Sequence, residues 1–244
     1  MALDRMFGPF RLRASRGIKV RGYLSSTQDA ALCSAKGDSP ALIEEIEKLP
    51  SDGVFIDCGS NCGFYSALTA THLGPKGKVF SIEPSYREFS RLQWARRNNL
   101  HECCWAIFFA GAGDTMTLAR IDTSVGHTGM NRISSLASGK QHEECPLLTL
   151  DFICENYLDE EDTIDLLKID VEGFETNVLR GLARTLEQRR VKRIFIEITD
   201  KFLKQAGSSR DELYALMDAH GYQATRTLDQ WQYDEVFVSP EALD

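Results

Sequence analysis

Val54–Ser66 reads V-F-I-D-C-G-S-N-C-G-F-Y-S. A short apolar strand ends at Asp57, the chain turns at Gly59 and Gly63, and a helix begins directly afterwards. Because glycine has no side chain, a strand that passes through a glycine loop into a helix N-terminus forms a concave edge that can admit a small polar ligand. The stretch therefore predicts an α/β domain with a ligand site at the end of this strand.

Strand and helix patterns alternate along the rest of the chain. Apolar strands are predicted over Val54–Asp57, Lys78–Ile82, Trp105–Ala110, Thr163–Ile169 and Val191–Ile198, and helices over Tyr65–Leu73, Tyr86–Asn98, Leu150–Tyr157, Glu175–Arg184 and Arg210–His220. Two strands then follow without a helix between them, Tyr222–Thr227 and Glu235–Ser239, with a turn at Leu228–Gln230. This order predicts a Rossmann-like, doubly wound α/β fold. Its sheet is mostly parallel and seven-stranded, with helices on both faces and a C-terminal antiparallel hairpin.

Residues 1–50 differ in character from the rest and are predicted to form an N-terminal cap or extension, with a helix over Pro40–Lys48. Residues 51–244 are predicted to form the main domain. Within it, Thr115–Ile121 is expected to extend the sheet or to form a small β-arm. The polar segment Ser124–Glu144, which contains His127, is too long for an ordinary connection.

The composition is that of an ordinary globular protein. The chain has 244 residues, 43% hydrophobic and 26% charged, with a net charge of −8 and a pI of about 5.2. An acidic protein repels phosphate backbones, so we expect no nucleic-acid partner. No apolar run resembles a signal peptide or a membrane span, so a cytoplasmic location is expected. Four arginines at helical spacing are interpreted as a solvated helix face: Arg87, Arg91, Arg96 and Arg97.

The second strand indicates which kind of ligand the sheet binds. It ends at Glu83, 24 positions after Gly59, where a carboxylate can accept hydrogen bonds from two ribose hydroxyls. Dinucleotides and S-adenosylmethionine both carry such a ribose. The Gly59-x-x-x-Gly63 spacing departs from the G-x-G-x-x-G of dinucleotide sites, and the acidic, amide-rich loop suits a sulfonium amino acid better than two phosphates.

Four segments together resemble the FkbM-like S-adenosylmethionine-dependent methyltransferases: V-F-I-D-C-G-S-N-C-G-F-Y-S, S-I-E-P, L-L-K-I-D-V-E-G-F-E-T-N-V-L-R-G and I-F-I-E-I. The resemblance covers about residues 53–200 and implies S-adenosyl-L-methionine as the cofactor. It implies that Glu83 holds the ribose, that Gly111 and Ala112 line the adenine, and that the loop after the first strand holds the methionine part. The loop residues assigned to the cofactor are Asp57, Gly59, Ser60, Asn61 and Gly63.

Carboxylates at the ends of the fourth and fifth strands are the candidates for catalysis. Asp170 is the leading candidate for a base that takes the proton of a hydroxyl acceptor, and Glu172 and Glu197 are expected near the same pocket. Lys168 is expected to form an ion pair with one of these carboxylates. Asp170 and Glu197 could bracket a divalent cation, but no third ligand is evident, so no metal site is predicted.

The sequence therefore predicts an enzyme, an S-adenosylmethionine-dependent methyltransferase. The resemblance favours O-methylation of a hydroxyl on a small molecule, such as a sugar or a natural product. N-methylation of a small molecule or a peptide side chain stays open, as do an NAD-dependent oxidoreductase and a binding module without activity. The identity of the acceptor and the oligomeric state are not decided by the sequence.

Overall fold

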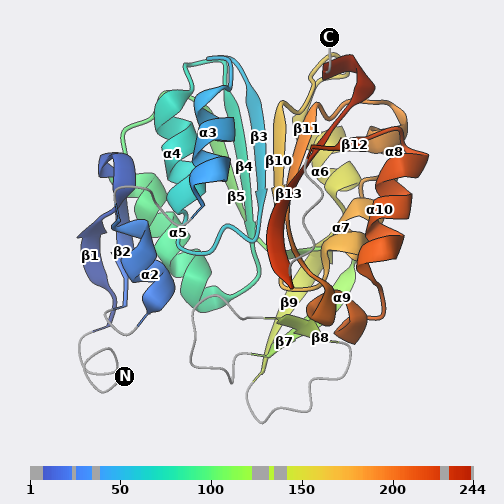
Figure 1. The fold of residues 1–244 in the computed structure, drawn as a ribbon. Helices are drawn as coiled ribbons and strands as arrows, with labels where there is room; N and C mark the ends of the chain where they lie inside the picture. Colours follow the sequence, from blue (N-terminus) through green and yellow to red (C-terminus); the bar gives the residue numbers. More distant parts are fainter. Residues whose placement is uncertain are drawn as a thin grey trace.

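The centre of the molecule is a seven-stranded sheet with the order β12-β13-β11-β10-β3-β4-β5 (Figure 1). The computed structural model describes residues 8–23, 26–34, 39–122, 132–134, 142–225 and 231–242. The strands of this sheet are β3 (Val54–Cys58), β4 (Lys78–Glu83), β5 (Cys104–Phe109), β10 (Leu166–Ile169), β11 (Arg193–Thr199), β12 (Gln223–Ala224) and β13 (Gln232–Val238). All neighbours pair in parallel except β13, which is antiparallel to both β11 and β12. The predicted fold class is confirmed.

Helices cover both faces of the sheet (Figure 1). One face carries α3 (Pro40–Glu47), α4 (Phe64–His72) and α5 (Tyr86–Asn98). The other face carries α6 (Leu150–Tyr157), α7 (Glu175–Arg180), α8 (Ala183–Glu187) and α10 (Arg210–Ala219). The short helix α9 (Asp200–Gln205) follows β11 directly, and the turn η2 (Pro240–Ala242) follows β13. No helix in the described part of the chain is long and apolar enough to cross a membrane.

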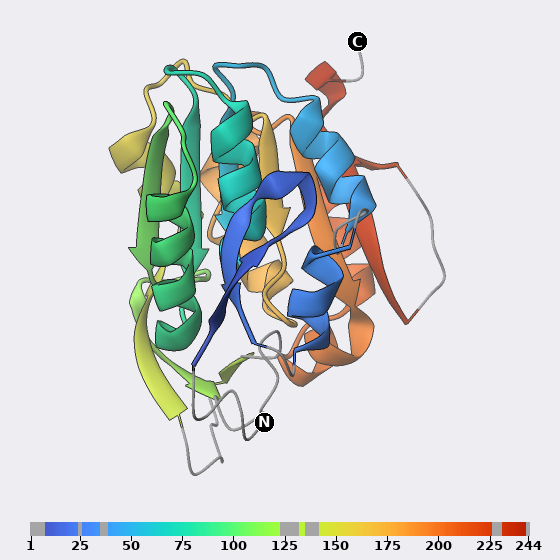
Figure 2. The ribbon, with the colours of Figure 1, turned by 90° about the vertical axis from the view of Figure 1, so that its left-hand side faces the viewer.

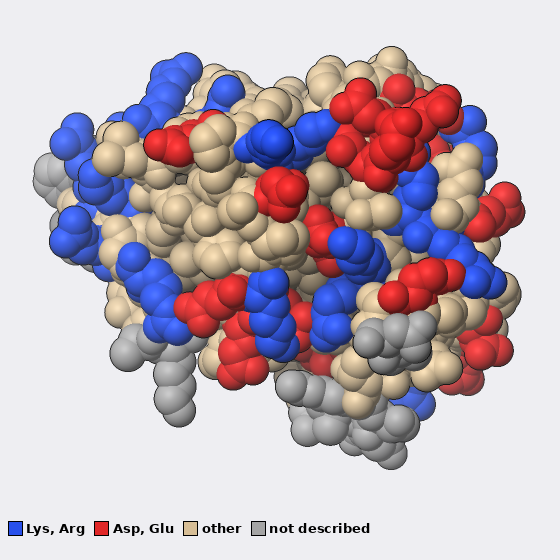
Figure 3. All heavy atoms as spheres, turned by 90° about the horizontal axis from the view of Figure 1, so that it is seen from above, with Lys and Arg blue, Asp and Glu red and all other residues tan. Residues whose placement is uncertain are grey.

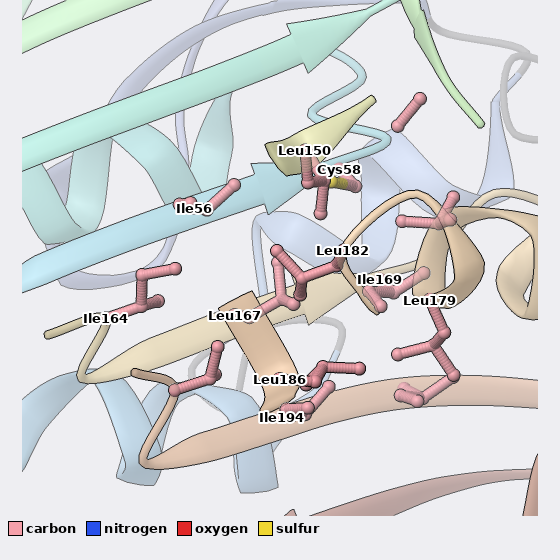
Figure 4. Packing of buried hydrophobic residues seen from close by; sticks show 14 of the residues in the cluster. Ile56, Cys58, Leu150, Ile164, Leu167, Ile169, Leu179, Leu182, Leu186 and Ile194 are labelled. Carbon is pink, nitrogen blue, oxygen red and sulfur yellow. The ribbon is translucent and has the colours of Figure 1, made fainter. Parts of the chain in front are cut away.

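The sheet is buried on both faces, as its nearly continuous apolar strands predict. On one side, side chains of the central strands such as Ile56, Leu167 and Ile194 belong to one cluster with Leu186 of α8 and Leu182, which lies just before α8 (Figure 4). A second cluster joins the opposite side of the sheet to α3, α4 and α5. Strands β3 and β10 have no exposed residue, so their ends are held firmly where the site is expected.

The N-terminal region packs on the α4–α5 side of the molecule. It contains the hairpin of β1 (Phe10–Arg13) and β2 (Lys19–Gly22), linked through the turn η1 (Ser15–Gly17), and then α2 (Thr27–Leu32). The hairpin lies against α5 (Figures 1 and 2). The apolar side chains of this region belong to the same core cluster as those of the main sheet.

This packing corrects the interpretation of the α5 arginines as one solvated face. The Arg91 side chain is 1% exposed and forms ion pairs with Glu88 and with Asp29 of α2. Its Nε donates to the backbone oxygen of Arg21 at 2.7 Å. The sequence of α5 alone could not show this, because Asp29 and Arg21 lie 62 and 70 residues before Arg91 in the sequence.

A second sheet lies at the carboxyl ends of the parallel strands, in the lower part of Figure 1. Its order is β6-β9-β7-β8, with β6 (Gly111–Ala112), β7 (Thr117–Asp122), β8 (Arg132–Ser134) and β9 (His142–Leu148). The predicted β-arm over Thr115–Ile121 is therefore found as β7, and β9 was not predicted. His127 and the turn Leu228–Gln230 lie outside the described residues.

One predicted helix is interrupted. The prediction of a single helix over Glu175–Arg184 is wrong, because α7 ends at Arg180 and α8 begins at Ala183. Gly181 lies between them, and a Cβ there would sit 1.9 Å from the backbone oxygen of Gly113. The break therefore lets the chain approach the strand-end loop after β6.

The opposite end of the sheet carries interspersed charges of both signs (Figure 3). Residues at or just before the starts of the parallel strands pair there: Lys78 with Asp162 at 2.5 Å and Lys192 with Asp165 at 2.7 Å.

Candidate active site

Backbone hydrogen bonds, two of them to β4 and one within the loop, hold the loop between β3 and α4. The backbone N–H groups of Gly59 and Ser60 both donate to the Ile82 carbonyl at 3.1 Å, and that of Gly63 donates to Ser60. Gly59 has a φ of +79°, and a Cβ there would lie 1.8 Å from the backbone oxygen of Asp170. Glycine is thus required at this position so that the loop can approach the end of β10.

Gly63 has a different reason to be glycine. Its φ is +82°, and a Cβ would lie 2.7 Å from Leu92 Cδ1 of α5. The second glycine of the motif therefore lets the start of α4 pack against α5. The two glycines therefore allow close packing of the loop against other parts of the chain, Gly59 against the end of β10 and Gly63 against α5.

Lys168 is the central cation of this edge. The side chain is 4% exposed, and its Nζ lies 3.2 Å from Asp57 Oδ1 and 3.3 Å from Asp170 Oδ2. It also donates to the Gly59 carbonyl at 2.9 Å. Burial would lower the pKa of Lys168, but the carboxylates of Asp57 and Asp170 outweigh it and raise the pKa above its ordinary value. The predicted ion pair is confirmed, and its second partner, Asp57, was not predicted.

Asp57 lies beneath the loop. Its side chain is fully buried, with Oδ2 accepting a 2.5 Å hydrogen bond from Ser66 Oγ of α4. The Ser60 hydroxyl donates to the Asp57 backbone oxygen at 2.7 Å. The carboxylate thus ties β3, β10 and α4 together at the point where the loop begins.

Both carboxylate oxygens of Glu83 accept hydrogen bonds from backbone amides. Asn61 N–H donates to Oε2 at 2.8 Å and Ser85 N–H donates to Oε1 at 2.9 Å. The side chain is buried, and burial, with a contribution from Glu88, raises the pKa of Glu83 to about 8. A carboxylate fixed in this way has lone pairs left for further donors, as a ribose diol would supply.

Gly111 and Ala112 form β6 and are both buried. This strand follows β5 and packs against β4, which ends in Glu83. Cys145 of β9 joins them, since Glu83 and Gly111 are among the groups that influence its thiol, whose pKa is raised to about 11 mainly by burial. The structure thus brings the two residues predicted for adenine to the same corner as Glu83.

Asp170 and Glu197 form a carboxyl pair at the ends of β10 and β11. The Asp170 side chain is 26% exposed, and Glu197 is half-buried. The Asp170 carboxylate, together with burial, raises the pKa of Glu197 to about 9. Glu172, whose backbone has a φ of 57°, also raises it. Gln232 Nε2 of β13 donates to Glu197 Oε1.

With its pKa raised to about 9, Glu197 is protonated near neutral pH. Lys168 lies on the Asp170 side of the pair, with its Nζ 3.3 Å from Asp170 Oδ2. Asp170 is therefore a partly exposed carboxyl at the strand-end edge, with a cation on one side and Glu197 on the other. Among the described residues, no group of three or more His, Cys, Asp or Glu could hold a metal ion.

Sequence reasoning missed the contribution of the N-terminal region to this edge. Gln28 of α2 accepts a 3.2 Å hydrogen bond from Asn61 Nδ2. Asn61 has a φ of 49° and is the residue whose amide binds Glu83. No local signal in residues 26–34 could have revealed this contact, because it depends on how α2 docks.

Together, the strand order, the glycine loop and the acidic residue at the end of β4 define a class I methyltransferase fold. The family model of the methyltransferase FkbM domain matches residues 57–224, which include all the strand ends described above except β13. The chain belongs to the FkbM methyltransferase family and is an S-adenosylmethionine-dependent methyltransferase.

Individual relatives are distant. The methyltransferase sdnD of Sordaria araneosa is 24% identical over 220 residues, covering 78% of this chain and 82% of that protein. The structure of precorrin-6y C5,15-methyltransferase from Geobacter metallireducens has a TM-score of 0.41 at 14% identity, covering 82% of this chain and 85% of the other. An rRNA methylase from Streptococcus thermophilus has a TM-score of 0.45 at 9% identity, covering 81% and 94%. Likeness of this size carries no conclusion about the acceptor.

Proposed function

We propose that the protein transfers the methyl group of S-adenosyl-L-methionine to a hydroxyl oxygen of a small molecule, a sugar or a natural product, with Asp170 as the base. The observation that carries the proposal is the Lys168–Asp170–Glu197 arrangement. It holds the partly exposed Asp170 carboxyl at the strand-end edge, between the Lys168 cation and a carboxyl, Glu197, whose pKa is raised. Bound there, the cofactor would supply an electrophilic methyl group, and a hydroxyl acceptor must lose its proton as the new bond forms.

Asp170 would receive that proton. Such a base contributes about 10²–10⁴-fold to a rate when it lies within hydrogen-bond reach of the reacting oxygen. Glu197, whose pKa is raised to about 9, would be neutral near pH 7 and so would not add a second negative charge to the site. Glu172 follows in the same loop and would border the acceptor.

The residues at the ends of β3 and β4 would hold the cofactor. Glu83 would accept hydrogen bonds from the two ribose hydroxyls, since its carboxylate is already fixed by two backbone amides. Gly111 and Ala112 would line the adenine beside it. Gly59 and Lys168 fix the conformation of the loop after β3, and the loop would hold the methionine part of the cofactor. The loop residues predicted for this role are Asp57, Gly59, Ser60, Asn61 and Gly63. Asp57, being fully buried, would act through Lys168 and the loop backbone.

The proposal also covers the class of acceptor, the location of the protein and its division into domains. A net charge of −8 and the acidic strand ends favour a small acceptor over a nucleic acid. A cytoplasmic location, and a division into an N-terminal cap over 1–50 and a methyltransferase domain over 51–244, are proposed on the sequence pattern. The Gln28–Asn61 contact supports a role of the cap at the cofactor loop.

The test is a screen of candidate acceptors with methyl-labelled S-adenosylmethionine, followed by mass spectrometry of the product. Sugars and natural products with free hydroxyls are compared with amines and peptides. A label on oxygen supports the proposal. A label found on nitrogen overturns the O-methylation assignment, and turnover by Asp170→Asn equal to that of the native protein overturns the assignment of the base.

A further inference from the structure

The loop that carries Asp170 has an unusual backbone. Two successive residues adopt left-handed angles, Glu172 with a φ of 57° and Gly173 with a φ of 108°. A non-glycine residue rarely has a positive φ. Successive left-handed or turn conformations make neighbouring N–H groups converge into a concave anion-binding nest.

An internal carboxylate occupies this nest. Glu175, the first residue of α7, accepts at Oε1 from Gly173 N–H at 2.9 Å and from Val171 N–H at 3.3 Å. Glu175 is 2% exposed, and its Oε2 is buried without a hydrogen-bond partner in the described structure. Burial raises the pKa of Glu175 to about 7.

The loop is fixed on its other sides by backbone contacts. Asp170 N–H donates to the Cys58 carbonyl at 3.1 Å, which continues the pairing of β10 with β3. A Cβ on Gly173 would lie 2.6 Å from the Phe202 carbonyl of α9, so the loop is also pressed against that helix. Between these two points, the Glu175 side chain accepts from two N–H groups of the loop, those of Val171 and Gly173.

We propose that Glu175 is a positioning residue, which fixes the loop of residues 170–174 so that Asp170 stays between Lys168 and Glu197. The role in catalysis rests on the proposed function of Asp170 as the base. The conformational role does not, because it concerns only how the carboxyl pair is held. Glu175 contacts the loop and no reacting atom.

The Asp170–Glu197 pair itself reports the position of Asp170, without any acceptor. The pKa of Glu197 is measured by carboxyl carbon NMR in the native protein and in Glu175→Ala, Glu175→Asp and Glu175→Gln. Glu175→Ala and Glu175→Asp withdraw the acceptor from the nest, so the pKa of Glu197 should fall by about one unit or more as Asp170 moves away. Glu175→Gln keeps one acceptor oxygen without the charge and should retain the raised pKa.

Ser208→Ala is the matched control, because Ser208 Oγ binds Thr176 Oγ1 of α7 at 2.9 Å and does not touch the loop. It should lower stability and leave the pKa of Glu197 unchanged. Should Glu175→Ala fail to fold, the comparison of the Asp and Gln variants carries the same test. A raised pKa of Glu197 that persists in Glu175→Asp, or that falls equally in Ser208→Ala, would overturn the proposal.

The two proposals can fail separately. Turnover that survives Asp170→Asn removes Asp170 as the base, while a drop in the pKa of Glu197 in Glu175→Asp still establishes the positioning role. If the pKa of Glu197 is unchanged in Glu175→Asp while Asp170→Asn loses turnover, the positioning role of Glu175 is overturned and Asp170 is kept as the base.

Discussion

Glu83 should make cofactor affinity depend on pH, and lowering the pH from 8 to 6 should weaken binding of S-adenosylhomocysteine about 50-fold. The ribose hydroxyls need an ionised acceptor, whereas burial holds the pKa of Glu83 at about 8 in the free protein. About half of the carboxyl groups are then ionised at pH 8 and about 1% at pH 6. The difference corresponds to about 2 kcal/mol of binding free energy. Above pH 9 the affinity should level off.

Isothermal titration calorimetry between pH 6 and 9 measures this directly. In two buffers with different ionisation enthalpies, the heats should also reveal proton release on binding near pH 7. Glu83→Gln is the control, since it cannot ionise and keeps the titration of the ligand's own amino group. We expect weaker binding by this variant at pH 8 and a much flatter pH dependence. If the native protein and Glu83→Gln have the same pH dependence, Glu83 does not hold the ribose.

Three further substitutions test other parts of the site. Asp170→Asn should lower kcat about 10²–10⁴-fold and leave the affinity for S-adenosylhomocysteine within about twofold, as measured by initial rates and calorimetry; an unchanged kcat would contradict its role. Lys168→Met should lower the free energy of unfolding in urea by about 3–5 kcal/mol, because it leaves buried Asp57 without its cation. The matched change Lys204→Met, at an exposed pair, should cost less than about 1 kcal/mol, and equal losses would refute the argument. Gly59→Ala should be more destabilising than Gly207→Ala in thermal unfolding, since both have a positive φ but only the first places a Cβ 1.8 Å from another backbone oxygen; equal effects would show that the close approach does not matter.

The main sheet was predictable because its strands are apolar runs bounded by glycine, proline or polar residues. Helix α5 was predicted over Tyr86–Asn98 and found there, and β3 extends one residue beyond its predicted end. Strand β9 was missed because His142–Leu148 contains two glutamates and a proline, and it becomes a strand through its pairing with β6 and β7. The break after α7 was missed because it depends on how closely Gly181 approaches Gly113, which no periodicity encodes.

For the candidate site, the sequence likewise predicted where the residues lie and did not predict what each of them contacts. The ends of parallel strands meet at one edge, so topology alone placed Asp57, Glu83, Asp170 and Glu197 together. What each carboxyl does there depends on its neighbours: Asp57 is buried under Lys168, and Glu83 is fixed by two amides. These roles are set by distances of a few ångströms between elements far apart in the sequence, and the spacing of residues does not contain them.

The most direct test of the account is a crystal structure of the protein with S-adenosylhomocysteine. We predict both ribose hydroxyls on the Glu83 carboxylate, the adenine against Gly111 and Ala112, and the amino acid part along the loop from Gly59 to Gly63. The sulfur should point toward Asp170. A ligand bound away from Glu83, or with its sulfur turned from the ends of β10 and β11, would contradict it.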